Sequence, residues 1–111
     1  MGPTTSNFIS LKTPEGIIRV STFRISHFIL YECSVKMIFS DGKYQKVSES
    51  MKAVEEASDK HGFFRIHQNF IVNLGQELHL NIKMRELTLI TGEKIIVAKD
   101  RLKQIKELLS V

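Results

Sequence analysis

Hydrogen-bonding side chains interrupt an apolar segment at residues 63–73, in the order Phe-Phe-Arg-Ile-His-Gln-Asn-Phe-Ile-Val-Asn. The apolar positions are typical of a strand that enters a hydrophobic core. Arg65, His67, Gln68 and Asn69 stand between them, and their guanidinium, imidazole and amide groups offer several donors and acceptors. A segment that packs into a core and also presents such groups at one bend predicts a recognition surface on a β scaffold.

The charges of the chain are unevenly distributed. The formal net charge is +4, and the strongest imbalance lies between residues 94 and 106, where Asp100 is the single acid. Residues 50–61 instead carry more acids than bases. An anionic partner should therefore contact the C-terminal part and avoid the middle segment, although a solvated helix face carries similar charges. The basic residues of the C-terminal cluster are Lys94, Lys99, Arg101, Lys103 and Lys106.

The sequence contains no recognisable catalytic arrangement. The four histidines, at positions 27, 61, 67 and 79, lack metal-ligand spacing, and the single cysteine, Cys33, has no partner for a zinc site. There is no glycine-rich phosphate loop, and no nucleophile or carboxylate pair stands in a catalytic context. We therefore expect no enzyme activity, no metal, no cofactor and no small-molecule substrate.

The number of cysteines and the hydropathy of the chain indicate the cellular compartment of the protein. One cysteine cannot form an internal disulfide, which favours a reducing compartment, and we expect Cys33 to be a small thiol in the core. No run approaches the roughly 20 apolar residues of a membrane-spanning helix, and no signal sequence opens the chain. These features predict a cytoplasmic protein without a membrane partner.

The length of 111 residues predicts one domain, with a loose N-terminal end at residues 1–10 and the folded part at residues 11–111. Short runs rich in β-branched and aromatic residues predict strands. Asp41-Gly42 predicts a hairpin, because glycine accepts the positive φ of a tight turn. The strands expected in this half are 17–20, 28–31, 35–39 and 44–47.

The spacing of apolar residues changes from a strand-like to a helical pattern at residues 50–61. Apolar residues there are three positions apart, which predicts a short amphipathic helix. Ser48 or Ser50 can cap its start, and Gly62 suits the left-handed position after its end. Strands then return, with Thr91-Gly92 turning the last pair, and Asp100 can cap a closing helix. The expected strands are 68–72, 78–83, 86–90 and 94–97, and the apolar face of the closing helix is Leu102, Ile105, Leu108 and Leu109.

This order of elements argues against a parallel α/β sheet, because no ten-residue helices alternate with the strands. We expect a mainly β fold of antiparallel strands with two short accessory helices. The expectation rests on periodicity and turn residues alone.

The run at residues 63–73 closely resembles the F-x-R-x-H-x-S-[FY]-[IV]-V-N core of the LytTR DNA-binding domain of bacterial transcriptional regulators, with Asn69 in place of the usual serine. Residues 28–32 (F-I-L-Y-E) are similar to the family's opening strand, and residues 92–97 (G-E-K-I-I-V) to its G-x-x-I-x-V. Asp41-Gly42-Lys43 and Ser50-Met51 are similar to its first hairpin and helix start. The resemblance spans about residues 17–109. It implies small antiparallel sheets packed in a row, with loops aimed at DNA.

The resemblance implies promoter DNA as the partner, bound by the output domain of a response regulator in a two-component system. Family members read DNA from loops, and the reading position after the motif histidine is Gln68 here. Glutamine can make a bidentate contact with adenine, and Asn69 has the same chemistry. Both amides could instead bond to backbone in a turn. His67 and Arg65 could likewise anchor the bend rather than touch DNA.

Two further loops complete the implied DNA-binding set. The loop after the opening strand is shorter than is usual in the family and leaves Ser34 and Lys36 as its candidates. Before the last helix, Lys99 keeps a positive charge, whereas Asp100 stands where some members have arginine. Basic residues there would contact phosphates. The candidate DNA contacts are Ser34, Lys36, His67, Gln68, Asn69, Lys99, Arg101 and Lys103.

Two functions stay open at this point. The first is a sequence-specific double-stranded DNA-binding module, which the resemblance implies would sit as two copies on direct repeats. The second is a protein-interaction module that keeps the scaffold and reads DNA weakly, as the short loop and Asp100 suggest. Whether the chain is a fragment of a longer regulator or a stand-alone member also stays open.

Overall fold

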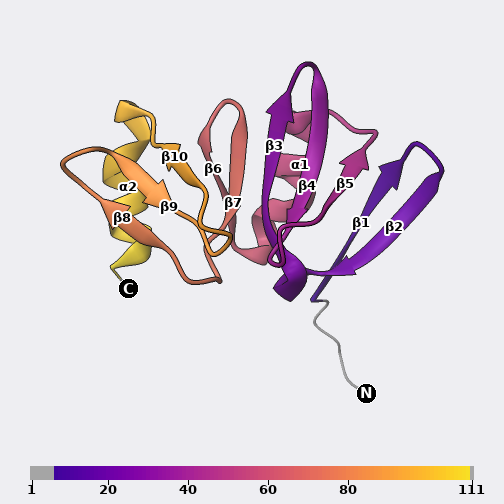
Figure 1. Ribbon diagram of the computed structural model, residues 1–111, viewed down its shortest axis with the longest axis horizontal. Coiled ribbons are helices and arrows are strands. Elements are labelled where there is room, and N and C mark those ends of the chain that lie inside the picture. Colours follow the sequence, from indigo (N-terminus) through magenta and orange to yellow (C-terminus); the bar gives the residue numbers. More distant parts are fainter. Residues whose placement is uncertain (1–6, 111) are drawn as a thin grey trace.

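Three antiparallel sheets stand in a row, with two helices packed against them (Figure 1). This computed structural model describes residues 7–110 of the chain. A two-stranded hairpin lies at one end, a five-stranded sheet in the middle and a three-stranded sheet at the other end. The predicted fold class is therefore confirmed. Within the described residues, neither α-helix has the length and apolar character needed to cross a lipid bilayer.

The order of elements is strands, a helix, further strands and a closing helix, as the sequence predicts. The first half contains β1 (Phe8–Thr13), β2 (Gly16–Ser21), a 3-10 helix (Thr22–Arg24), β3 (Ile25–Tyr31), β4 (Ser34–Phe39), β5 (Tyr44–Val47) and α1 (Met51–Ser58). The second half contains a 3-10 helix (Asp59–His61), β6 (Phe63–His67), β7 (Phe70–Asn73), β8 (His79–Asn81), β9 (Glu86–Thr88), β10 (Lys94–Ile96) and α2 (Lys99–Leu109).

The strand predicted at residues 17–20 lies within β2, but its partner β1 was not predicted. Ile9 and Leu11 alternate with more exposed residues and are buried, which is the period-two pattern of a strand with one covered face. Residues 8–10 therefore belong to the folded domain, and the prediction of a loose end up to residue 10 is wrong for them. Residues 1–6 of that predicted end lie outside the described part of the chain.

The turn between β3 and β4 contains only Glu32 and Cys33, both with positive φ (50° and 62°). Two consecutive left-handed residues form the tight turn whose twist matches that of the flanking strands. Cys33 is exposed in this turn, and the prediction of a core thiol is wrong. The turn lies beyond the end of the packed sheet, so the side chains of its two residues are exposed to solvent.

The strand predicted at residues 68–72 is wrong in its limits. Gln68 and Asn69 form the turn of a hairpin between β6 and β7. A bulge lies between Arg65 and His67, and Ile66 at the bulge is fully buried. Because a bulge bends the strand that carries it, the polar side chains of this segment gather at the end of the hairpin.

Ser50 and Gly62 flank the helical segment as predicted, but α1 itself ends at Ser58 and the last three residues of the segment form a 3-10 helix. The Ser50 hydroxyl oxygen accepts a hydrogen bond from the Ala53 backbone N–H at 3.1 Å, which satisfies one free donor at the helix start. Gly62 follows the 3-10 helix after α1 with a φ of 83°. Glycine adopts this left-handed conformation without a steric penalty.

The start of α2 differs from the prediction. Ala98 occupies the N-cap position without a side-chain hydrogen bond, and the predicted cap by Asp100 is wrong. Asp100 lies in the first turn, where its negative charge interacts favourably with the helix dipole. On the predicted apolar face, Leu108 is 44% exposed, whereas the other three residues pack in the core.

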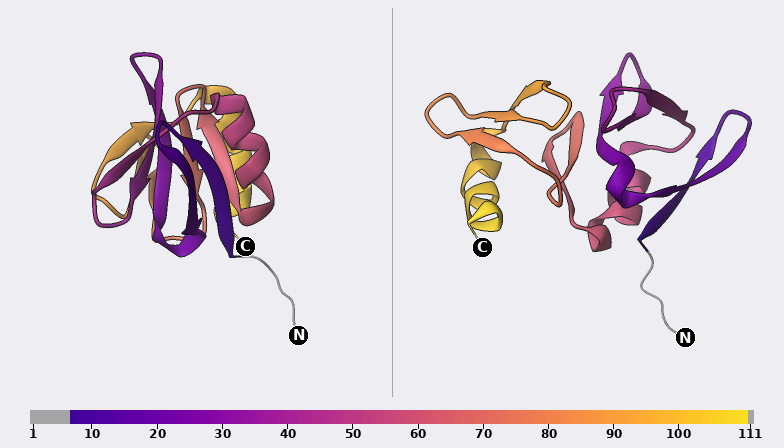
Figure 2. Two further views of the ribbon diagram at one scale, coloured as in Figure 1. Left: turned by 90° about the vertical axis from the view of Figure 1, so that its right-hand side faces the viewer. Right: turned by 60° about the horizontal axis from the view of Figure 1, so that its bottom comes forward.

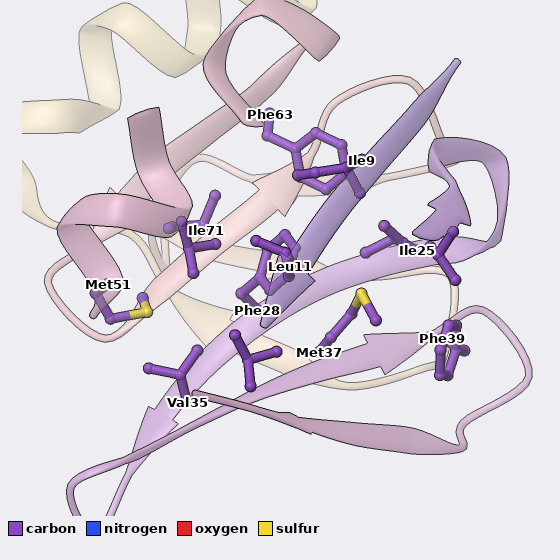
Figure 3. Packing of buried hydrophobic residues seen from close by; sticks show 13 residues of the cluster. Ile9, Leu11, Ile25, Phe28, Val35, Met37, Phe39, Met51, Phe63 and Ile71 are labelled. Carbon is purple, nitrogen blue, oxygen red and sulfur yellow. The ribbon is translucent and has the colours of Figure 1, made fainter. Parts of the chain in front are cut away.

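Two hydrophobic cores lie on opposite faces of the five-stranded sheet. The first is closed by α1 and the hairpin β1–β2, and Figure 3 shows Phe28, Met37 and Ile71 pointing into it. The ring centroids of Phe28 and Phe63 lie 5.7 Å apart there. The second core lies between β6–β7, the three-stranded sheet and α2.

Strand β7 contributes to both cores. Ile71 belongs to the first core, whereas Val72 and the partly buried Phe70 belong to the second. Successive side chains of a strand point to opposite faces, so a strand covered on both faces is apolar throughout. This double coverage explains the uninterrupted apolar run that ends the motif.

Asn73 ends β7 and is buried. Its side-chain N–H groups donate to the carbonyls of Thr22 and Ile25 at 3.0 and 2.9 Å, and its carbonyl accepts from the Gly75 backbone N–H at 2.8 Å. A buried amide with both donors and its acceptor bonded avoids the penalty of an unpaired polar group. Asn73 therefore ties β7 to the 3-10 helix before β3.

His27 links the five-stranded sheet to the loop between β9 and β10. The side chain is fully buried, with Nδ1 2.8 Å from the Ser26 hydroxyl and Nε2 3.1 Å from a Glu93 carboxylate oxygen. A hydroxyl that donates to Nδ1 leaves Nε2–H to donate to the carboxylate. Burial lowers the pKa of His27, and the charge of Glu93 opposes that change in part.

The stability of the domain should depend on pH through His27. Because burial holds its pKa below 6.5 in the folded state, the unfolded chain takes up a proton at higher pH than the folded domain does. The free energy of unfolding should therefore decrease as pH falls below about 6.5 and stop decreasing at the folded-state pKa. Urea unfolding across about pH 5 to 8 measures this slope.

Two variants test whether the pH dependence of the unfolding free energy arises from the contact between His27 and Glu93. His27→Gln should remove the contribution of His27. Glu93→Gln should extend the loss of stability to lower pH, because it removes the carboxylate that raises the His27 pKa. A slope that is the same in wild type and His27→Gln would contradict this assignment.

Candidate nucleic-acid interface

Three connecting segments lie along one edge of the molecule. They are the β3–β4 turn, the β6–β7 turn and the segment that enters α2, all at the top of Figure 1. Both views in Figure 2 keep them at the same end. The edge therefore brings together residues that are far apart in the sequence.

The β6–β7 turn is held from two sides. The Arg65 guanidinium donates to the Gln68 carbonyl at 2.7 Å and to the Glu55 carboxylate of α1 at 3.0 Å. On the other side, the Asn69 carbonyl accepts from the Leu30 backbone N–H at 2.9 Å. The conformation of the turn is therefore fixed through its backbone, without using its amide side chains.

His67 supports the same turn. Its Nδ1 accepts a hydrogen bond from the Asn69 backbone N–H at 3.2 Å, and its ring packs edge-on against Phe70 at a centroid distance of 5.9 Å. One ring nitrogen is thus engaged in the turn. Both Arg65 and His67 therefore anchor the bend. Nε2 of His67 has no hydrogen-bond partner within residues 7–110, and contact of His67 with DNA stays a prediction.

The amide groups of Gln68 and Asn69 remain unused within residues 7–110, since neither side chain has a hydrogen-bond partner there. Gln68 is exposed and Asn69 is half-buried. An amide that is held by its backbone and free at its tip can pair with a base edge at a small entropic cost.

Arg101 fastens the start of α2 to β6. Its guanidinium donates to the Arg65 carbonyl, at 2.6 Å, and lies over the Phe64 ring at 5.6 Å from the centroid. The Ala98 backbone N–H donates to the Ile66 carbonyl at 3.3 Å. These contacts join two of the three segments into one rigid unit.

A surface hollow of about 500 Å³ lies where these two segments meet. Its lining combines a free amide, an imidazole and both signs of charge. Sequence reasoning named five of the lining residues, all except Ala98, but the two segments are about 30 positions apart and their juxtaposition follows only from the fold. The lining residues are Arg65, His67, Gln68, Ala98, Asp100 and Arg101.

The remaining predicted contacts lie at the surface of the same edge. Lys99 and Lys103 are exposed, one helical turn apart on α2. Ser34 pairs with Tyr31 directly beside the β3–β4 turn. Lys36 lies two positions further along β4, with its ammonium 4.9 Å from the centroid of the Tyr44 ring.

Sequence reasoning missed Lys46. The register of β4 and β5 places Lys46 directly opposite Lys36, so the two ammonium groups share one face of the sheet. The Asp41-Gly42 turn could have revealed this pair, because a hairpin turn sets the register of its strands. No group of three or more metal-binding side chains occurs in the described part of the chain.

Comparison with known proteins decides the family. The family model of the LytTr DNA-binding domain matches residues 15–110, which is most of the chain. The protein belongs to the LytTr DNA-binding domain family. The family is one of DNA-binding domains, and the resemblance noted in the sequence is confirmed.

A solved structure agrees with the fold of this LytTr domain. It is the LytTr DNA-binding domain, from Bacillus cereus, of a protein named as a methyl-accepting/DNA response regulator. The TM-score is 0.73 and the sequence identity 20%, over 96% of this chain and 100% of that chain. At this identity the likeness shows the shared fold alone. A search of curated proteins found no match.

Proposed function

We propose that this LytTr domain binds double-stranded DNA sequence-specifically through the edge formed by its three segments. The observation that carries the proposal is the β6–β7 turn, whose backbone is fixed while the Gln68 and Asn69 amides stay free. Rigid presentation of amides suits direct reading of base edges in the major groove. The domain would then act as the output part of a bacterial transcriptional regulator in the cytoplasm.

We assign base reading and phosphate binding to different residues of the edge. Gln68 and Asn69 read bases, with Nε2 of His67 available beside them. Lys99, Lys103 and the remaining N–H groups of Arg101 bind phosphates at one end of the edge, and Ser34 and Lys36 do so at the other. Phosphate contacts position the protein, whereas base contacts specify the sequence.

The rival function is a protein-interaction module that reads DNA weakly. Two observations favour it: the Asp100 carboxylate lines the hollow beside Gln68, and the β3–β4 turn has only two residues. A carboxylate repels phosphates, and a short turn reaches less far into a groove. Binding to DNA in the presence of competitor separates the two functions.

Gln68→Ala tests the proposal at its central residue. The wild-type domain should hold its promoter site in the presence of excess unrelated DNA at moderate salt. Gln68→Ala should lose about 1 to 3 kcal/mol of affinity for that site and little for random DNA, since a bidentate adenine contact is lost. Fluorescence anisotropy titrations on both DNAs measure the difference.

The outcomes separate the hypotheses. Equal losses on both DNAs would make Gln68 a structural residue or a phosphate contact. Wild-type binding that unrelated DNA abolishes would favour the interaction module.

The basic residues of α2 should contribute equally to the affinity for every DNA sequence. Neutralising Lys99, Arg101 and Lys103 to glutamine should weaken binding to promoter and random DNA together. Each lost phosphate contact should reduce the slope of log affinity against log salt by about one unit. A triple variant with the wild-type slope would exclude this surface from the interface.

Two copies of the domain should occupy one full site. One small domain with three short segments contacts few bases, and direct repeats allow neighbouring copies without a two-fold protein axis. We therefore expect a monomer in free solution and a complex of two domains with one DNA. Sedimentation velocity of each sample measures the masses, and a tight dimer without DNA would contradict the proposal.

A further inference from the structure

Two lysines face each other across β4 and β5 without an acid between them. Lys36 and Lys46 are direct partners in the antiparallel register. Side chains at such positions have Cβ atoms about 5 Å apart, and like charges there destabilise the sheet. The pair therefore lowers the stability of the folded domain.

The surroundings do not neutralise this pair. No ion pair to either ammonium occurs within residues 7–110. The Glu49 carboxylate, three residues after Lys46, instead accepts from the Lys12 backbone N–H at 2.8 Å. Tyr44 holds the Lys36 ammonium over its ring, which positions the charge but leaves it positive.

The pair lies in line with the turn that carries Gln68. Across the sheet, Lys46 pairs with Lys36, Lys36 with Ile29, Ile29 with Phe70, and Phe70 with His67. Adjacent strands are about 4.8 Å apart, so four steps span about 19 Å. At about 3.4 Å per base pair along one strand, this distance corresponds to roughly five or six base pairs.

We infer that Lys36 and Lys46 together form a phosphate-binding site that contacts the DNA backbone about half a helical turn from the bases read at Gln68. The inference rests on the proposed function and extends its footprint to β5, where no contact was expected from the sequence. A phosphate between two ammonium groups removes their repulsion. The pair is thus unfavourable in the free domain and favourable in the complex.

The first test measures the salt dependence of binding to random DNA. Lys46→Gln should reduce the slope of log affinity against log salt by about one unit, and Lys36→Gln with Lys46→Gln by about two. Lys43→Gln is the matched control. It removes the same charge from the same hairpin, but at the β4–β5 turn, at the opposite end of β4 from Ser34.

The second test uses the free domain. At low salt, Lys46→Gln should raise the melting temperature by roughly 1 to 5 °C, because it removes a like-charge neighbour. The gain should disappear in about 1 M salt, where charges are screened. Lys43→Gln should show no such gain, since no lysine faces it across the strands.

Either of two results overturns the inference: a wild-type salt slope in Lys46→Gln, or an equal decrease in slope for Lys43→Gln. The proposed function fails in a different way. A wild-type domain that binds random and promoter DNA alike would remove sequence specificity, yet the slopes would still report whether this pair holds a phosphate.

Discussion

Strand β7 is the element on which the rest of the structure depends, because its alternate side chains are buried in two different cores. Ile71 packs with α1 and the N-terminal hairpin, whereas Val72 packs with the C-terminal sheet and α2. Neither core can shift without moving the other. Asn73 adds three hydrogen bonds at the end of the strand. The turn before β7 is therefore held at a fixed place between both halves of the domain.

Cations at the candidate interface have two different tasks. Arg65 and Arg101 bind carbonyls and a carboxylate of the protein itself, and their charge-assisted hydrogen bonds are stronger than neutral ones. Exposed lysines flank the turn at both ends of the edge. In the proposed function, the amides between them would read bases from a support that does not need to rearrange. Such preorganisation reduces the entropy lost on binding.

Local signals in the sequence predict local structure here. Asp41-Gly42, Ser50 and Gly62 each act within a few residues, and each lies where it was expected. Residues 68 and 69 were assigned to a strand because the apolar run that follows them, which is buried on both faces, lacks the alternation that would mark its start. Contacts between distant segments leave no periodic pattern in the sequence. One example is the contact of His27 with Glu93, which are separated by 66 positions. Lys46 was missed because its significance depends on the register with Lys36. Thus the family and the candidate residues Gln68 and Asn69 follow from the motif, but the position of their turn and the shape of the edge follow from packing.

The most direct test of the account is to map which backbone amides respond when promoter DNA is added to the isotope-labelled domain. Chemical-shift changes in two-dimensional NMR spectra should concentrate at the β3–β4 turn, at Gln68 and Asn69, at the start of α2 and around Lys36 and Lys46. The amides of α1 and of the β1–β2 turn should keep their positions. Changes confined to α1 or to the N-terminal hairpin, with the β6–β7 turn unaffected, would contradict the claim that this edge reads DNA.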